Sequence, residues 1–460
     1  RNILSPAQNR QLDEWLAEPP REWPARVADF ARRHQLLPGA YLYGQTAIWR
    51  FTGARFSFLN GRFNVSGDRW FFPYAFLVKT PLTVFAICGL ALAAGIHAGG
   101  RKRRAAMPAS AAKWPALYDT LPLWTLFGIY WIAVQLSHLN IGNRHILVTY
   151  PPLLVLAGAA GYWLRDAGRN HRALALALCG LMAGLAAEVF YRYPNYLAYF
   201  NVVAGGPAQG YRHLVDSSLD WGQELPGVKA YLDRHPSNGP FYLSYFGMDE
   251  PAYYGISAGR LYSAPGQDVP PPLFILTLPL AQVDATVANV QRTYPAYEVA
   301  AAMAAADNQV QVVMLKNPRA LRWAAGTYLI SATMLQPLNF VQTGPLGPWN
   351  ERFEAEYQEL ARLASPLLAD DQQVRIARLR EHTPAEWENI LTRFEAFRFG
   401  RLTAFLRRRE PDDNINFSIL VYHLGDADIT QALQGPPPEL GSDLPKTMEQ
   451  DAGGRMTDAR

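Results

Sequence analysis

Residues 80–98 read TPLTVFAICGLALAAGIHA and contain no Asp, Glu, Lys or Arg. A helix needs about 20 largely uncharged residues to cross the hydrocarbon of a bilayer. Residues 120–137 and 146–164 are likewise uncharged, and residues 173–191 are uncharged apart from Glu188 near the end. Uncharged runs of this length are rare in soluble cores, so we expect four transmembrane helices.

The composition fits a chain that is part membrane-embedded and part soluble. Of its 460 residues, 49% are hydrophobic and 18% are charged, against about 25% charged in typical soluble domains. This balance excludes an intrinsically disordered chain. The net charge of +4 is too small to indicate a nucleic-acid partner. Two cysteines provide neither a disulfide framework nor a Cys-based zinc site.

Basic residues predict how the four helices are oriented. The first and third connections between the apolar runs hold Arg101, Lys102, Arg103, Arg104 and Lys113, and then Arg165, Arg169 and Arg172. The second connection has only Arg144. The positive-inside rule puts the two basic connections in the cytoplasm. Residues 1–69, the loop 139–145 and everything after residue 191 are then expected to face outward.

The soluble parts divide by their apolar periodicity. We expect a helical extracytoplasmic segment broken by Gly39, Gly44, Gly53 and Gly61, with a helix at residues 24–34. Strands are predicted at 241–246, 273–278, 310–315, 325–333 and 417–423, and helices at 223–235, 281–294, 350–363 and 384–409. The predicted units are therefore 1–69 (extracytoplasmic segment), 70–191 (four-span region), 192–318 (α/β domain), 319–433 (α+β extension) and 434–460 (disordered tail).

No metal, nucleotide or nucleophile motif is present in the sequence, so no cofactor is identified and nothing supports a divalent metal. Two cations stand at the expected outer surface instead. Lys79 precedes the first span, and Arg144 lies beside Asn140, Asn143 and His145 in the loop 139–145. Both cations suit the oxygens of a lipid-linked phosphate. Lys79 is equally well explained as a snorkelling lysine, and Arg144 as an interfacial anchor.

A third cluster reads DSSLDWGQE, residues 216–224. Asp216, Asp220, Trp221 and Gln223 supply carboxylates, an indole and an amide, which are groups that bind sugars. The structural alternative is that Asp220 is the N-cap of the following helix.

Several of these runs together resemble one family. They are WFFPYAFLVKTP (residues 70–81), GNRHILVTYP (142–151), YPNYLAYFN (193–201) and DWGQ (220–223). Their order and spacing are similar to those of bacterial phospholipid-carrier-dependent glycosyltransferases of the protein mannosyltransferase and aminoarabinose transferase type, glycosyltransferase family 39 with the GT-C fold. The resemblance covers about residues 60–225, and residues 325–333 and the closing strand also look similar.

The resemblance implies an inverting enzyme of the bacterial inner membrane. Such an enzyme transfers a sugar from a polyprenyl-phosphate carrier to a protein, lipid or glycan acceptor at the outer face, among membrane lipids. Lys79, Arg144 and His145 would hold the donor phosphate. Asp216, Asp220, Trp221 and Gln223 would bind the sugar or acceptor.

The resemblance also implies that the catalytic residue lies upstream of Arg1, so this chain is expected to be a carboxy-terminal part that is inactive alone. The family pattern Ser-Asn-Leu-Asp is Ser-Ser-Leu-Asp here, with Ser218 as the departure. The alternative is a non-catalytic membrane protein with an extracytoplasmic glycan- or partner-binding domain. A transporter fits less well, because ionisable residues at mid-membrane depth are nearly absent.

Overall fold

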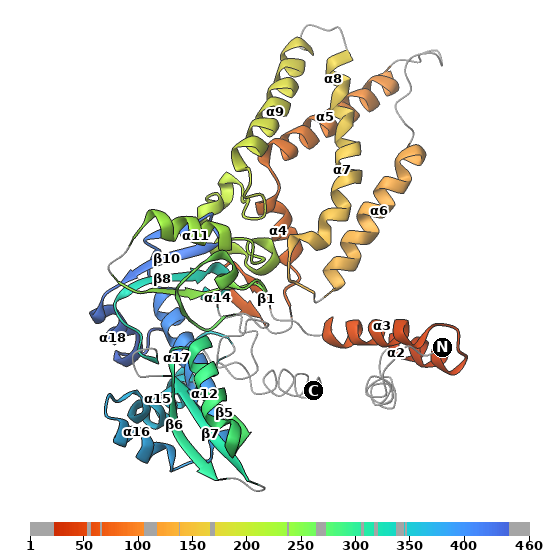
Figure 1. Cartoon of the computed structure of the whole chain (residues 1–460). Coiled ribbons are helices and arrows are strands. Elements are labelled where there is room, and N and C mark those ends of the chain that lie inside the picture. Colours follow the sequence, from red (N-terminus) through yellow and green to blue (C-terminus); the bar gives the residue numbers. More distant parts are fainter. Residues whose placement is uncertain are drawn as a thin grey trace.

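The structure is a computed structural model of the chain. It describes residues 23–52, 57–64, 67–104, 117–137, 139–165, 171–236, 239–263, 273–304, 308–316, 321–336, 345 and 347–440. Long helices project to one side of the molecule, and two sheets with their covering helices lie at the other (Figure 1).

The helical part contains two helices that are long and apolar enough to cross a membrane. One spans 143–165 and joins η1 (Asn143–Thr149), α7 (Tyr150–Ala157), η2 (Gly158–Gly161) and α8 (Tyr162–Arg165). The other is α9 (His171–Arg192). The predicted spans at 146–164 and 173–191 are thereby confirmed as membrane-spanning candidates.

The first predicted span begins at a sharp bend. Helix α4 (Phe71–Lys79) meets α5 (Leu82–Arg104) at 98°, and the pair has the length and composition of one further span. The bend falls at Thr80-Pro81, because proline has no N–H to continue the helical ladder. The second predicted span is the helix α6 (Leu117–Leu136), which packs beside α7. Asp119, Pro122 and Gln135 interrupt the apolar sequence of α6, which is not among the described helices that are long and apolar enough to cross a membrane.

Two sheets form the remainder. The larger has the order β4 (Gly259–Arg260), β3 (Phe241–Ser244), β8 (Gly326–Ser331), β10 (Ile419–Leu424), β9 (Asp413–Ile415). Strands β3 and β8 are parallel, and β8 and β10 are antiparallel with Ser331 opposite Ile419. The smaller sheet is antiparallel, in the order β5 (Leu273–Pro279), β7 (Gln309–Lys316), β6 (Tyr297–Ala304).

Further helices accompany the two sheets in this part of the molecule. They are α10 (Gly210–His213), α11 (Leu225–Arg234), α12 (Val283–Thr293), α14 (Ala332–Leu335), α15 (Glu351–Ala364), α16 (Gln372–Leu379), α17 (Pro384–Leu406) and α18 (Asp426–Gln434). Short 3₁₀ turns connect them: η3 (Val202–Ala204), η4 (Pro207–Gln209), η5 (Asp216–Ser218), η6 (Pro251–Tyr254), η7 (Leu280–Gln282) and η8 (Ser365–Leu368).

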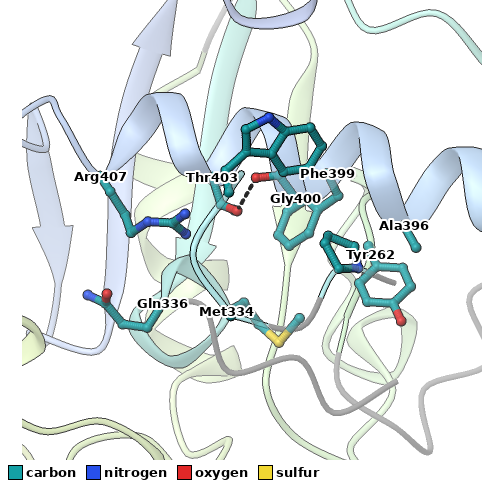
Figure 2. Close-up of a pocket in the computed structure, with 11 residues that line it drawn as sticks. Tyr262, Met334, Gln336, Ala396, Phe399, Gly400, Thr403 and Arg407 are labelled. Atoms are coloured by element: carbon teal, nitrogen blue, oxygen red, sulfur yellow. Dashed lines mark hydrogen bonds between the residues drawn. The ribbon is translucent and has the colours of Figure 1, made fainter. Parts of the chain in front are cut away.

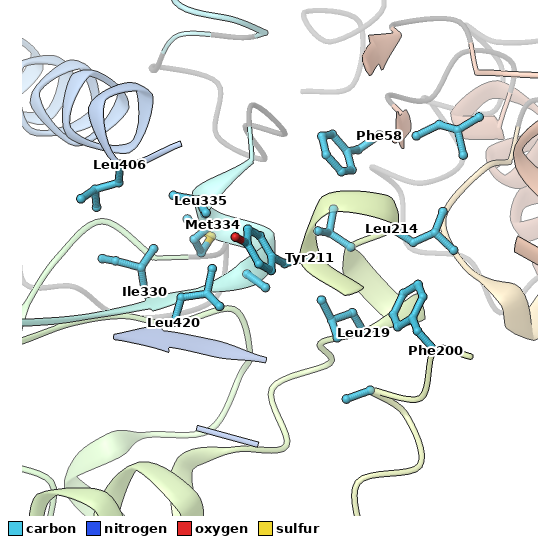
Figure 3. Packing of buried hydrophobic residues seen from close by; sticks show 14 of the residues in the cluster. Phe58, Phe200, Tyr211, Leu214, Leu219, Ile330, Met334, Leu335, Leu406 and Leu420 are labelled. Carbon is cyan, nitrogen blue, oxygen red and sulfur yellow. The ribbon is translucent and has the colours of Figure 1, made fainter. Parts of the chain in front are cut away.

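One hydrophobic cluster joins the helical part to the larger sheet. Phe72 and Ile146 lie at its membrane end, and Tyr328 and Leu420 of the sheet at the other. Figure 3 shows its middle, where Tyr211 and Leu214 lie between Phe58 and Leu420. This shared core fixes the sheets relative to the adjoining ends of the long helices.

The amino-terminal segment is more regular than predicted. Helix α2 (Trp23–Arg33) confirms the predicted helix, but α3 (Gly39–Thr52) runs through Gly44, where a break was expected. Leu42 packs on the buried alanines of α2, and this contact outweighs the roughly 1 kcal/mol cost of a helical glycine. The strands β1 (Ser57–Leu59) and β2 (Arg62–Asn64) form a hairpin that the sequence reading missed.

Two predicted boundaries need correction. The predicted boundary between residues 318 and 319 divides the larger sheet, because β3 from the first unit pairs directly with β8 from the second. Residues 434–440, which were predicted to belong to a disordered tail, are part of the described structure. Gln434 ends α18, and the Glu439 carboxylate accepts hydrogen bonds from the Arg407 side chain and the Trp349 amide. Residues 441–460 lie outside the described part of the chain.

Candidate functional site

The three clusters that the sequence singles out converge on one residue, Ser218. The Lys79 ammonium at the end of α4 donates hydrogen bonds to the carbonyl oxygens of Leu197 (2.7 Å) and Ser218 (2.5 Å). It also lies 4.4 Å from the centre of the Phe200 ring. Lys79 therefore ties the bend between α4 and α5 to the segment 216–224.

The loop between α6 and η1 reaches Ser218 from the other side. The Asn143 amide donates to Ser218 Oγ (3.1 Å), and Ser217 Oγ donates to the Ile141 carbonyl (2.8 Å). The two segments touch closely at Gly142, where a Cβ atom would lie 2.2 Å from Ser217 Oγ. Only glycine fits this approach.

This contact brings Arg144 over Trp221. The guanidinium carbon lies 4.9 Å from the centre of the indole ring, a cation–π arrangement. Arg144 is exposed, and 53% of Trp221 is exposed. The Phe246 ring packs edge-on against the indole, with 6.0 Å between the ring centres. We call Arg144 and Trp221 the Arg–Trp pair.

Asp220, which directly precedes Trp221, is fully buried. Its carboxylate accepts hydrogen bonds from the Gly222 amide (3.1 Å) and from the Ser331 hydroxyl at the end of β8. Burial raises the pKa of Asp220 to about 7, and the nearby carboxylates of Glu224 and Asp216 act in the same direction. The N-cap interpretation of Asp220 is wrong, because α11 begins at Leu225 with Glu224 in the cap position.

Asp216 and Gln223, the other polar residues of this segment, differ in their exposure to solvent. Asp216 is buried with a positive φ of 57°, and its amide donates to Thr333 Oγ1 (2.9 Å). Its carboxylate accepts from the Ser217 amide. Gln223 is exposed, and its side-chain oxygen accepts from the Trp221 amide (2.7 Å). Of the predicted sugar-binding residues, Trp221 and Gln223 are therefore the ones that face outward.

His145 does not join Arg144 at the Arg–Trp pair, although the two residues are adjacent in sequence. Its ring packs edge-on against Phe72, with 6.3 Å between the ring centres. Within the described ranges, no group of three or more His, Cys, Asp or Glu residues is arranged to hold a metal ion. Lys79, Arg144, Asp216, Asp220, Trp221 and Gln223 thus form one neighbourhood, and His145 belongs to the helix packing behind it.

Sequence reasoning missed the residues that assemble this neighbourhood. Ser218 was discounted as a departure from the family pattern, yet both its carbonyl and its hydroxyl are bonded. Ser331 and Phe246 come from strand ends more than 20 residues away, and no local pattern marks them. The sequence shows a glycine at position 142 but not that it approaches Ser217 closely.

A small cavity lies elsewhere, between α14 and α17 (Figure 2). Its volume is about 40 Å³, and Met334, Phe399 and Thr403 line it with the side chains of Gln336 and Arg407. This space is enough for a few water molecules but not for a sugar. Comparison with known proteins finds no match to this chain among family models, curated proteins or solved structures.

Proposed function

We propose that this protein is an integral membrane glycosyltransferase that transfers a sugar from a polyprenyl-phosphate carrier to an acceptor. In this proposal four helices, α5, α6, the 143–165 helix and α9, span a bacterial inner membrane. The sheets then lie outside the cytoplasm. The observation that carries the proposal is the convergence of Lys79, Arg144 and Trp221, which are far apart in sequence, around Ser218.

The position of this neighbourhood supports a lipid-linked donor. It lies where the outer ends of α4 and of the 143–165 helix meet the sheet part of the molecule (Figure 1). The opposite ends carry Arg165 and Arg172, as the positive-inside rule requires of cytoplasmic ends. A phosphate at the membrane surface would then be within reach of the Arg–Trp pair.

The chemistry of the Arg–Trp pair suits a sugar phosphate. A guanidinium that stacks on an indole keeps its N–H edge free for phosphate oxygens, which it matches as a fork. The exposed indole is a flat surface for a sugar ring. As the sugar leaves, negative charge develops on the carrier phosphate, and a fixed cation stabilises that charge. Lys79 holds the backbone that positions the pair.

A second candidate is a binding protein without catalytic turnover. It is favoured by the burial of Asp216 and Asp220, since neither carboxylate is placed to deprotonate an acceptor in this conformation. In that case the Arg–Trp pair and Gln223 would recognise a glycan or glycolipid without transferring it.

Transfer assays on the protein expressed from its own gene in its natural membrane test the proposal. The donors are undecaprenyl-phosphate sugars that carry labelled mannose, glucose or aminoarabinose. We expect Arg144→Gln to lower the transfer rate about 100-fold. We expect Trp221→Ala to raise KM about tenfold, because the sugar loses its stacking surface.

The control is Arg234→Gln, an exposed arginine on α11 whose guanidinium donates to the Ala230 carbonyl of the same helix. Its transfer rate should be unchanged. Wild-type transfer by both Arg144→Gln and Trp221→Ala would contradict the proposal. Donor binding that depends on Arg144, with no transfer by the wild-type protein, would establish the second candidate.

A further inference from the structure

The two helices α2 and α3 form a hairpin with a small core of its own. Ala28 and Ala31 of α2 pack against Leu42 of α3. Larger apolar side chains of the same hairpin remain at its surface, where each is 45–60% exposed: Val27, Phe30, Leu36, Leu37 and Tyr41. We call these five residues the α2–α3 apolar surface. Exposed apolar residues that gather in one place mark sites of contact with another protein or with a membrane.

The exposed apolar residues of α2 follow the helical period. Val27 and Phe30 are three residues apart and therefore lie on one side of the helix. Asp29 and Arg33, which form an ion pair (2.8 Å), lie on a different side. Helix α2 thus has one apolar arc. The half that carries the buried alanines is covered by α3, and the half that carries Val27 and Phe30 is exposed.

The turn after α2 has a defined backbone form. Gln35 has a positive φ of 52°, and its amide donates to the Arg32 carbonyl (3.1 Å). The Leu36 amide donates to the Ala31 carbonyl (2.8 Å). This pair of bonds is the Schellman arrangement, which ends a helix with one residue in the left-handed conformation. The exposed leucines of the turn are therefore a defined part of the fold.

The hairpin lies at the end of the long helices that adjoins the sheets. Figure 1 shows α3, drawn in red, lying across the direction of α7 and beyond the end of α6 that leads into the loop 139–145. A helix in this position runs along the surface of a membrane that the long helices cross. Amphipathic helices with Phe or Leu on one face and charged residues on the other are typical of that location.

A second group of exposed apolar residues marks the same end of the long helices. Its members are 61–78% exposed: Trp70, Tyr193, Val202 and Val203. Trp70 directly precedes α4, and Tyr193 directly follows α9. The two valines lie in η3, and Asn201 just before them bonds the carbonyls at the end of α4. Trp and Tyr are enriched where a membrane meets water, so lipid is the partner that suits both groups of residues.

We propose that the α2–α3 hairpin rests on the outer surface of the lipid bilayer. The α2–α3 apolar surface inserts at the boundary between headgroups and acyl chains, and the charged side of α2 stays in water. This inference rests on the membrane placement in the proposed function, but it uses no part of the transfer reaction.

Spin labels on the whole chain test the proposal in vesicles of phosphatidylethanolamine and phosphatidylglycerol. Cys88 and Cys179 are first replaced by Ala, and one cysteine is then introduced as Phe30→Cys or Leu36→Cys. Oxygen concentrates in hydrocarbon, whereas a water-soluble nickel complex is excluded from it. The ratio of the label's collision rates with oxygen and with nickel therefore reports its depth. We expect this ratio to be several-fold higher at both positions than at Arg33→Cys, the matched control on the charged side of α2, whose side chain is 74% exposed.

Two reference labels separate the failure of this proposal from the failure of the membrane placement. Phe190→Cys on α9 is the reference for lipid, and Met248→Cys is the reference for water, because both residues are exposed. If Phe30→Cys and Leu36→Cys match Met248→Cys while Phe190→Cys gives the ratio of a label in lipid, the proposal is wrong and the membrane placement stands. If Phe190→Cys also matches Met248→Cys, both are wrong.

A third result would also contradict the proposal. Low collision rates with both reagents at Phe30→Cys and Leu36→Cys would show that a protein, such as a second copy of the chain, covers the α2–α3 apolar surface. All labelled residues are exposed, so the substitutions have small effects on stability. A thermal melt of each variant confirms that it is folded, and the two positions give independent readings of the same surface.

Discussion

Asp220 shows how a residue chosen for its chemistry can have a structural role. The sequence presents it as an exposed carboxylate beside an indole, but it is fully buried and bonded to Ser331 and Gly222. A charged group in this position costs free energy unless it takes up a proton. Asp220 therefore supports the backbone next to Trp221.

The raised pKa of Asp220 predicts a pH dependence of stability. The folded state holds the proton up to about pH 7, whereas the unfolded chain releases it near 3.8. Between these values the folded state binds more protons, so stability falls as pH rises, by about 4 kcal/mol in total. Asp220→Asn keeps both hydrogen-bond partners and removes this titration.

Thermal unfolding between pH 4 and pH 8 measures this effect. The wild-type midpoint should fall across the range more steeply than that of Asp220→Asn, and the variant should be the more stable at pH 8. Asp233→Asn is the control, because Asp233 is an exposed partner of Lys229 on α11. Equal slopes for the wild type and Asp220→Asn would disprove the protonated, buried state.

At the level of elements, Asn201 fixes the bend between α4 and α5. Its side-chain amide donates to the carbonyls of Leu77 (2.6 Å) and Thr80 (3.0 Å), and its oxygen accepts from the Ala204 amide (3.3 Å). Asn201 is 1% exposed. The carbonyls that the bend removes from the helical ladder are thus satisfied by a residue more than 100 positions later.

We expect Asn201→Ala to destabilise the protein by about 3 kcal/mol, because three buried partners lose their hydrogen bonds. The matched control is Asn195→Ala in the same loop, where one long hydrogen bond to Asn416 (3.4 Å) is lost. Its expected cost is below about 1 kcal/mol. Thermal unfolding in detergent measures both. Equal costs for the two variants would show that Asn201 does not hold the bend.

Periodicity predicted the elements whose packing is regular. The strands β3, β5, β7, β8 and β10 and the helices α11, α12, α15 and α17 lie where apolar patterns put them. Strand β6 was missed because its sequence, YEVAAAMA, is rich in alanine, and it is a strand only because β7 pairs with it. The β1–β2 hairpin was missed because three residues per strand are too few to show alternation.

At the level of the whole molecule, contacts between distant segments limited what the sequence could predict. The family resemblance and loop charge selected Lys79, Arg144 and Trp221. Nothing in their spacing required them to meet. They meet because Ser218 bonds both Lys79 and Asn143. Ser331 at the end of β8 and Thr333 in α14 support the 216–220 segment.

The larger sheet likewise combines strands from both predicted domains. Strand β3 lies between β4 and β8, so residues 241–244 depend on residues 326–331 for one set of ladder hydrogen bonds. A boundary placed at a change in composition cannot detect such pairing. Residues 241–244 and 326–331 therefore belong to one sheet.

Accessibility labelling of intact cells tests the central claim, that the Arg–Trp pair and the sheets lie outside the cytoplasm. Cys88 and Cys179 are first replaced by Ala, and one cysteine is introduced at Met248, which is 82% exposed, or at Arg172. We predict that a membrane-impermeant maleimide labels Met248→Cys in intact cells and labels Arg172→Cys only after permeabilisation. Protection of Met248→Cys in intact cells, with labelling of Arg172→Cys, would contradict the account.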